Sequence, residues 1–276
     1  MSQVVNDKAG KGRSRRPGKV CLGVVHLDPL PGTPFHEAGS FGRILDDTVA
    51  SVRALYEGGA HGALLQTVDR VYSPRDESDP ARIAAMALIT RAAREATGDD
   101  FRVGVQLMRH ATKSSLAVAK VCGGDFVRAT AIVGATVSTH GLVEADPLDV
   151  MEYRRKVDAW DVQIIADVDS THFQWLGGSV PTESTARQAA FVGADAVCLG
   201  SKDEERTLHT IAAVRRTAPD VPVYLAGHTD HENAARLMAH ADGAFVSTCL
   251  GGWKGRIEVE KVAAYMDILR SLEDAE

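Results

Sequence analysis

The chain of 276 residues is 45% hydrophobic and 25% charged, and its formal net charge is −6. This composition is that of a folded globular protein and excludes a disordered or collagen-like chain. The negative charge argues against nucleic acid as a partner, because phosphate binding needs a basic face. No apolar run approaches the roughly 20 residues that a membrane span requires.

Residues 1–18 are polar and rich in Gly, Lys and Arg, which predicts a flexible basic tail. They contain no apolar segment of the kind found in secretory signals. The four cysteines occur singly, so we expect reduced thiols that pack as small hydrophobic side chains, and a cytoplasmic location. We place one folded domain at residues 19–276.

From residue 19 onward, short apolar runs alternate with longer amphipathic stretches. The predicted strands are 19–27, 62–67, 103–108, 125–130, 162–168, 195–199, 221–226 and 243–248. The predicted helices are 46–58, 80–95, 113–121, 146–158, 183–192, 204–216, 231–239 and 257–272. Continuous apolar runs are typical of strands buried on both faces of a parallel sheet, and their alternation with helices predicts βα units.

Eight such units predict a single (β/α)8 TIM barrel. The helix-to-strand junctions GGAHGALL, CGGDFVR, VGADAVCL and HADGAF repeat one Gly-containing pattern, which favours one barrel over two domains. The alternative is an open doubly wound sheet, but VVHLDPLPG follows the first strand where that fold usually has GxGxxG. Because barrels often associate, we expect a homo-oligomer.

The chemistry of a TIM barrel lies at the carboxyl ends of its strands and in the loops that follow them. Polar side chains at these positions are therefore candidates for contact with a substrate. They are Gln66, Gln106, Arg109, Arg128, Thr130 and His140. Arginine is the side chain best suited to bind the anionic groups of a small molecule.

Several phrases resemble the BtpA/SgcQ family of barrel proteins along nearly the whole chain after the tail. The most specific is GVVHLDPLPGTP, and others are IIADVDSTHF, AGHTDHENAARLM and ADGAFVSTCLGG. The resemblance implies the barrel fold and gives added weight to His26 and His172, which lie within matching motifs. The family name comes from photosystem I biogenesis, and other members lie among sugar-utilisation genes, so the resemblance implies no single reaction.

This sequence departs from the family pattern at the predicted mouth of the barrel. The second strand ends in LQTVDR where the family has V-E-N-x-x-D, and the third in QLMRHA where it has N-V-L-R-N-D. STHG replaces T-D-Q-G in the loop after the fourth strand. The remainder of the family pattern is kept while polar residues at the predicted mouth are exchanged, which indicates an altered substrate.

Asp167 and Asp169 are the leading catalytic candidates. They are two residues apart on a predicted strand, so we expect both carboxylates on the inward face near the mouth. Such a pair could stabilise a developing cation, act as acid and base, or bind a divalent metal. The alternative is a salt bridge from this strand to Arg128 or Arg109.

His26, His172 and Glu144 complete the candidate catalytic set. No HxH or HExxH spacing occurs, so no dedicated metal site is predicted, although a divalent metal stays possible. Lys202 follows the sixth predicted strand, but its neighbours in GSKDEER are acidic and do not favour a Schiff base.

The loops after the last two strands predict a phosphate site. AGHT and STCLGG offer Gly227 for close backbone approach, and Thr229, Ser247 and Thr248 for hydroxyl donors. Barrels often bind phosphate at these loops with backbone N–H groups.

Together these residues predict an enzyme that acts on a phosphorylated sugar or a nucleoside-like molecule. Glycosyl transfer, or formation or cleavage of a glycosidic bond, suits the set best because carboxylates stabilise an oxocarbenium-like state. One alternative is a sugar-phosphate isomerase, epimerase or metal-dependent aldolase. The other, implied by the resemblance, is a non-catalytic assembly factor.

Overall fold

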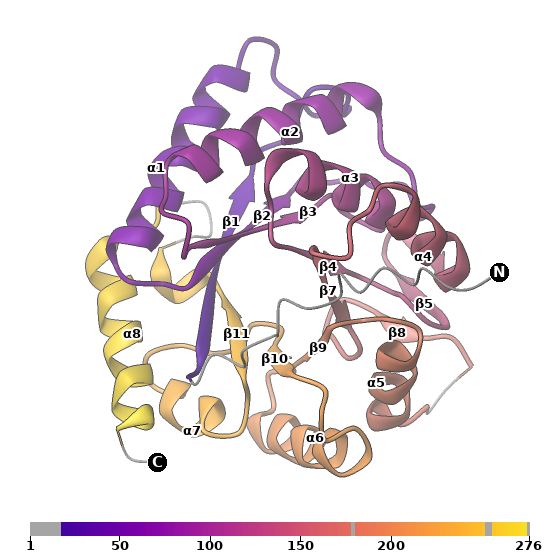
Figure 1. Cartoon of the computed structure of the whole chain (residues 1–276), viewed down its shortest axis with the longest axis vertical. Coiled ribbons are helices and arrows are strands. Elements are labelled where there is room, and N and C mark those ends of the chain that lie inside the picture. The colour runs from indigo at the N-terminus through magenta and orange to yellow at the C-terminus, as the bar shows by residue number, and fades with distance from the viewer. Residues whose placement is uncertain (1–17, 178–179, 252–255, 275–276) are drawn as a thin grey trace, which may run out of the picture.

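The computed structural model describes residues 18–177, 180–251 and 256–274. Nearly all of the predicted tail, residues 1–17, lies outside the described residues. Eight parallel strands close into a barrel in the order β1-β11-β10-β9-β7-β4-β3-β2, which confirms the predicted TIM barrel (Figure 1). The strands are β1 (Val20–Leu27), β2 (Gly62–Thr67), β3 (Arg102–Gln106), β4 (Phe126–Ala129), β7 (Gln163–Asp167), β9 (Ala196–Leu199), β10 (Val223–Leu225) and β11 (Gly243–Val246).

The helices surround the barrel and bury their apolar sides against it (Figure 1). They are α1 (Phe41–Glu57), α2 (Pro80–Glu95), α3 (Thr112–Cys122), α4 (Pro147–Lys156), α5 (Thr182–Phe191), α6 (Glu204–Thr217), α7 (Ala234–Met238) and α8 (Val259–Glu273). Asp79, Asp146 and Asp203 cap α2, α4 and α6 by accepting a hydrogen bond from a backbone N–H of the first turn. No helix among the described residues is both long and apolar enough to cross a bilayer.

Large apolar side chains fill the barrel interior beneath the carboxyl ends of the strands. Phe126, Tyr224 and Phe245 pack there on the inward faces of three strands. Gly104 makes room for Phe126, since a Cβ on Gly104 would lie 2.1 Å from the ring. The interior therefore closes below the mouth, as expected for a packed barrel core.

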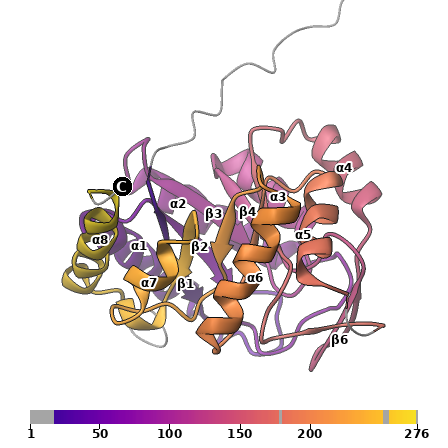
Figure 2. The ribbon, with the colours of Figure 1, turned by 90° about the horizontal axis from the view of Figure 1, so that it is seen from below.

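A small antiparallel sheet lies outside the barrel, where the sequence predicted only a long loop. It comprises β5 (Ala135–Ser138), β6 (Gly141–Glu144) and β8 (Gln174–Trp175) in the order β6-β5-β8. The indole N–H of Trp175 donates to the carbonyl of Val168 at 3.1 Å, which ties this sheet to the end of β7. The sheet extends from one edge of the molecule (Figure 2).

Candidate functional site

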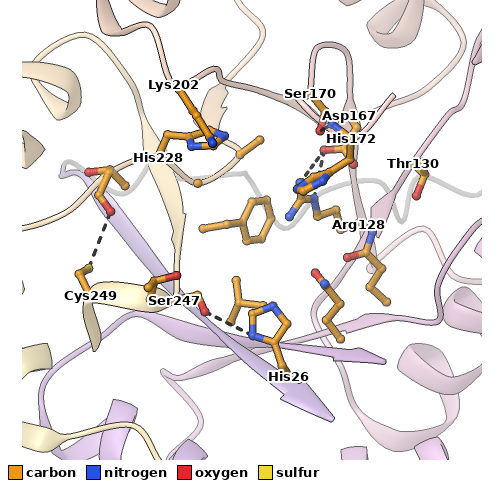
Figure 3. Close-up of a pocket in the computed structure, with 18 of the residues that line it drawn as sticks. His26, Arg128, Thr130, Asp167, Ser170, His172, Lys202, His228, Ser247 and Cys249 are labelled. Atoms are coloured by element: carbon orange, nitrogen blue, oxygen red, sulfur yellow. Dashed lines mark hydrogen bonds and ion pairs between the residues drawn. The ribbon is translucent and has the colours of Figure 1, made fainter. Parts of the chain in front are cut away.

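A cavity of about 790 Å³ opens at the carboxyl ends of the barrel strands, as the fold predicts (Figure 3). Most of the residues predicted for the site line it. They are His26, Gln66, Gln106, Arg109, Arg128, Thr130, Asp167, His172, Gly227, Thr229, Ser247 and Thr248. Because these residues come from seven different strands or the loops after them, only the closed barrel brings them together.

Three polar side chains lie side by side on adjacent strands at one wall. His26 of β1 is in register with Gln66 of β2, which is in register with Gln106 of β3. Nδ1 of His26 lies 3.3 Å from the hydroxyl of Ser247 on the other side of β1, and this contact orients the imidazole. The wall thus offers one imidazole and two carboxamides to a ligand.

Asp167 is the carboxylate at the centre of the opposite wall. Its Oδ1 accepts hydrogen bonds from Arg128 Nε at 3.1 Å, from Arg128 Nη2 at 2.9 Å and from the Cys198 thiol at 2.7 Å. Burial alone would lower the pKa of Arg128, but the charge of Asp167 outweighs it and raises that pKa. One oxygen of this carboxylate is therefore fixed by three donor atoms, two of them on the Arg128 guanidinium.

Cys198 has a role that the sequence analysis missed. We expected a small buried hydrophobe, but its thiol lies inside the barrel and bonds Asp167. The two residues are in register on β7 and β9. The alternation of side chains along AVCL indicates the inward position of Cys198, because it places Ala196 and Cys198 on one face of the strand.

The expectation that Asp169 shares the inward face with Asp167 is wrong. β7 ends at Asp167, so the alternation of a strand does not continue to Asp169. The Asp169 carboxylate instead pairs with Arg206 Nη2 of α6 at 2.8 Å and does not line the cavity. Burial raises the pKa of Asp169, and the charge of Arg206 opposes that rise.

His140 and Glu144 also lie outside the cavity, contrary to expectation. Both belong to the β5–β6 hairpin, which lies outside the barrel sheet where a simple loop was predicted. The His140 ring packs edge-on against Tyr72 with centroids 4.8 Å apart, and the Glu144 side chain is exposed on β6.

Arg109 and Gln106 line the cavity with buried polar atoms that lack partners. The residues are 6% and 3% exposed, and neither Arg109 Nε nor Gln106 Oε1 has a hydrogen-bond partner among the described residues. Thr130 donates its hydroxyl to the carbonyl of Arg109 at 2.6 Å and so fixes that backbone. Burial lowers the pKa of Arg109; the charge of Asp167 raises it in part and that of Arg128 lowers it again.

Two histidines in the loops that follow the strands have lowered pKa values, which favours the neutral imidazole. Burial lowers the pKa of His172, and the charges of Arg109 and Arg128 lower it further. Burial also lowers the pKa of His228, with a contribution from Lys202. Neutral imidazoles can accept a proton from a substrate or donate one hydrogen bond.

The loops after β10 and β11 form the wall proposed for phosphate. Gly227 has φ +103°, and nothing lies within 4 Å of the position that a Cβ would take, so the backbone faces open space. Thr248 begins the short helix η1 (Thr248–Leu250) and is exposed to the cavity. The Thr229 hydroxyl instead bonds Tyr265 of α8 at 2.8 Å, so it is already engaged. α7 begins only at Ala234, later than predicted.

Several lining residues were not on the candidate list. They include two carboxylates, Glu204 and Asp230, together with Ser170, Lys202, Asn233 and Cys249. Asn233 donates to Glu204 at 3.0 Å and to the carbonyl of His228 at 3.1 Å, so it joins α6 to the loop after β10. Among the described residues, no group of three or more His, Cys, Asp or Glu side chains is arranged to hold a metal ion.

The closed barrel with a polar cavity at its mouth places the chain among the TIM-barrel proteins. It belongs to the BtpA family, which residues 18–271 match. A relative named photosystem I biogenesis protein BtpA, from Synechocystis sp., is 27% identical and aligns over 90% of this chain and 87% of its own length. An uncharacterized protein from Archaeoglobus fulgidus is 31% identical over 88% of this chain and 96% of its own.

Solved structures share the fold at low sequence identity. A thiamine phosphate pyrophosphorylase from Pyrococcus furiosus has a TM-score of 0.58 at 18% identity and covers 94% of this chain and 98% of its own. A 2-keto-3-deoxy-6-phospho-gluconate aldolase from Zymomonas mobilis has a TM-score of 0.55 at 12% identity, with 94% and 95% covered. These likenesses establish the fold and not the reaction.

Proposed function

We propose that the chain is an enzyme acting on a phosphorylated sugar or nucleoside-like molecule, by glycosyl transfer or by formation or cleavage of a glycosidic bond. The observation that carries the proposal is the Asp167 carboxylate, which Arg128 and Cys198 fix at the wall of the cavity. Such a carboxylate stabilises the positive charge that develops on a sugar carbon in an oxocarbenium-like state.

The neighbours of Asp167 suit this role. Arg128 pairs with the Asp167 carboxylate at 2.9 Å, so we assign Asp167 an electrostatic role and not that of a general acid. The neutral imidazole of His172 lies in the loop that follows β7 and can take up a proton from an attacking hydroxyl. His26 lies on β1, which is four strands from β7 around the closed barrel, and so faces Asp167 across the cavity.

The substrate phosphate is assigned to the loops after β10 and β11. Gly227 offers backbone that a phosphate oxygen can approach, and Thr248 offers an exposed hydroxyl beside it. Ser247 contributes by orienting His26, and Thr229 by holding its loop against Tyr265. Cavity size agrees with a small substrate, because ligand sites commonly measure about 300–1,000 Å³.

The test is a direct search for turnover. The purified protein is incubated with sugar phosphates, nucleosides and nucleobases, and loss or formation of a glycosidic bond is followed by proton and phosphorus NMR. A product formed by the wild type and not by Asp167→Asn supports the proposal. Turnover that is equal in Asp167→Asn, or that leaves every glycosidic bond intact, contradicts it.

The relative named for photosystem I biogenesis favours a second candidate, an assembly role. That role requires no chemistry at the mouth of the barrel. It predicts no turnover and no binding of small phosphorylated molecules, with substitution of Asp167 affecting only stability. A third alternative is a sugar-phosphate isomerase, epimerase or metal-dependent aldolase. It gains support if the same screen shows carbon–carbon or carbonyl chemistry that a divalent metal stimulates.

A further inference from the structure

Arg109 differs from the other buried arginines of the chain. Arg82 pairs with Asp69 at 2.5 Å and Arg154 with Asp195 at 2.8 Å, so each buried charge meets a carboxylate. Arg109 is 6% exposed and forms no ion pair with a described residue. A buried guanidinium without a counter-charge is strongly destabilising, which is why buried charges are usually paired.

The protein contacts of Arg109 are weak and leave part of the guanidinium unused. Its Nη2 donates to the carbonyl of His172 at 3.4 Å, and the group lies 6.0 Å from the centroid of the Phe173 ring. Its Nε–H is buried in the cavity wall and has no acceptor among the described residues. Arg128 cannot supply the missing charge, because it is itself cationic and already holds Asp167.

The strand order places Arg109 opposite the proposed phosphate loops. Arg109 follows β3 and Gly227 follows β10, and these strands are four positions apart in the closed ring of eight. They therefore lie across the diameter of the barrel mouth. β7 lies midway between them in the ring, so Asp167 is beside the middle of a molecule that spans the mouth. In Figure 3, His228 and Lys202 lie on one side of the cavity, and Arg128 and Thr130 on the other.

We propose that Arg109 binds a second anionic group of the substrate, so that the substrate carries an anion at each end and its reacting carbon between them. The inference rests on the proposed function and names its substrate class more closely. One end is the phosphate at the loops after β10 and β11. The other is a phosphate or carboxylate that accepts from the Arg109 guanidinium, in the geometry that this group favours for such anions.

Calorimetric titration with matched probes tests this inference. Fructose 6-phosphate carries one anionic group, fructose 1,6-bisphosphate a phosphate at each end, and 6-phosphogluconate a phosphate and a carboxylate. The wild type is expected to bind a probe with two anions about tenfold more tightly than fructose 6-phosphate, the usual gain from a hydrogen bond to a charged group. Which of the two favoured probes binds more tightly identifies the second anion.

In Arg109→Gln, the ratio of the affinity for a probe with two anions to the affinity for fructose 6-phosphate is expected to fall near one. Fructose 6-phosphate itself should bind as before. The matched control is Arg206→Gln, which removes an arginine that pairs with Asp169 outside the cavity and should keep the ratio. Arg109→Lys retains the charge without the fork of donors, so its ratio should fall between the two. This variant keeps the test informative if the Gln variant folds poorly.

The stability of the ligand-free protein supplies an independent readout. Arg109→Gln removes a buried charge that forms no ion pair with a described residue, so its Tm in the absence of ligand should equal or exceed that of the wild type, and inorganic phosphate should raise its Tm less. A structural role for Arg109 predicts the reverse, a lower Tm and an unchanged response to phosphate, and would overturn the inference.

The two proposals fail in different ways. If fructose 6-phosphate binds and its binding depends on Gly227, but Arg109→Gln leaves the ratio unchanged, the second anion site is wrong and the phosphate site stands. If the wild type shows no preference for two anions, the second site is again wrong. If no probe binds at all, the phosphorylated-substrate proposal fails and the second site falls with it.

Discussion

Asp167 and Asp169 are two residues apart but have different surroundings, because β7 ends at Asp167. Asp167 is the last residue of β7 and faces inward, where Arg128 and Cys198 hold it. Asp169 lies in the loop, and its carboxylate turns to Arg206. Sequence spacing predicted that both would face the cavity. The prediction failed for Asp169 because period-two alternation holds only while the backbone stays extended. Where a short strand stops is the least certain part of such a prediction.

Asp167→Asn removes the charge of the carboxylate at the centre of the site and keeps the size of the side chain. We expect turnover in the NMR assay to fall about a hundredfold or more, as when a preorganised electrostatic group is removed. The protein should also lose up to about 3 kcal/mol of stability because Arg128 is left buried without a counter-charge. Asp169→Asn is the matched control and should change turnover little.

The double variant Arg128→Gln with Asp167→Asn distinguishes the two effects. Removing both charges should recover much of the stability in urea unfolding but none of the turnover. Recovery of turnover along with stability would show that Asp167 serves the fold alone.

His110 makes stability depend on pH. Its side chain is buried, and burial, together with the charges of Arg109 and Lys113, lowers the pKa of the imidazole to about 4 from 6.5. As pH falls below 6.5, the unfolded chain binds a proton that the folded protein does not. Stability is therefore lost between pH 6.5 and about 4, by about 1.4 kcal/mol per pH unit at most.

Urea unfolding at pH 6.5 and at pH 5 measures this dependence. His110→Gln should lose up to about 2 kcal/mol less stability than the wild type over that interval. Asp76 acts in the opposite direction, since burial raises its pKa to about 6 and its protonated form stabilises the fold at low pH. It is present in both proteins and cancels in the comparison, so parallel pH curves would contradict the assignment to His110.

At the scale of elements, the barrel strands were predictable because parallel strands buried on both faces leave continuous apolar runs such as VCLGVV and AVCL. The β5–β6 hairpin was not. Its strands are four residues each and half-exposed, so they carry no such run, and the STHG turn between them was interpreted as part of a loop. His140 and Glu144 were misplaced for the same reason. α1 was predicted too late, and Ser40, which precedes it, forms no side-chain capping hydrogen bond that would mark its start.

The loop after β10 supports a prediction about phosphate. Gly227 has φ +103° and Gly39 has φ +80°, and both face open space. Gly227→Val and Gly39→Val should therefore lower Tm by similar amounts, because a β-branched residue is strained in either backbone. Only Gly227→Val should weaken binding of fructose 6-phosphate in calorimetry, since Gly39 does not line the cavity. Equal affinity in both variants would remove this loop from the phosphate site.

At the scale of the whole molecule, the eight strands close into one ring, so we expect the chain from residue 19 onward to behave as one folded unit. Limited proteolysis should therefore trim only about the first 18 residues and leave one stable fragment, which mass spectrometry can identify. Early cleavage near the middle into two persistent fragments would contradict a single cooperative barrel. A homo-oligomer stays a prediction, to be measured by light scattering on the intact chain.

The aromatic layer of Phe126, Tyr224 and Phe245 has a kinetic consequence. Because it seals the barrel beneath Asp167, the cavity has a blind end, and molecules can pass only through the mouth. In a transfer between two substrates, the one that lies deeper must enter first, and its product must depart last. Initial-rate kinetics should then show a compulsory order, with the last product to leave competing only against the first substrate to arrive.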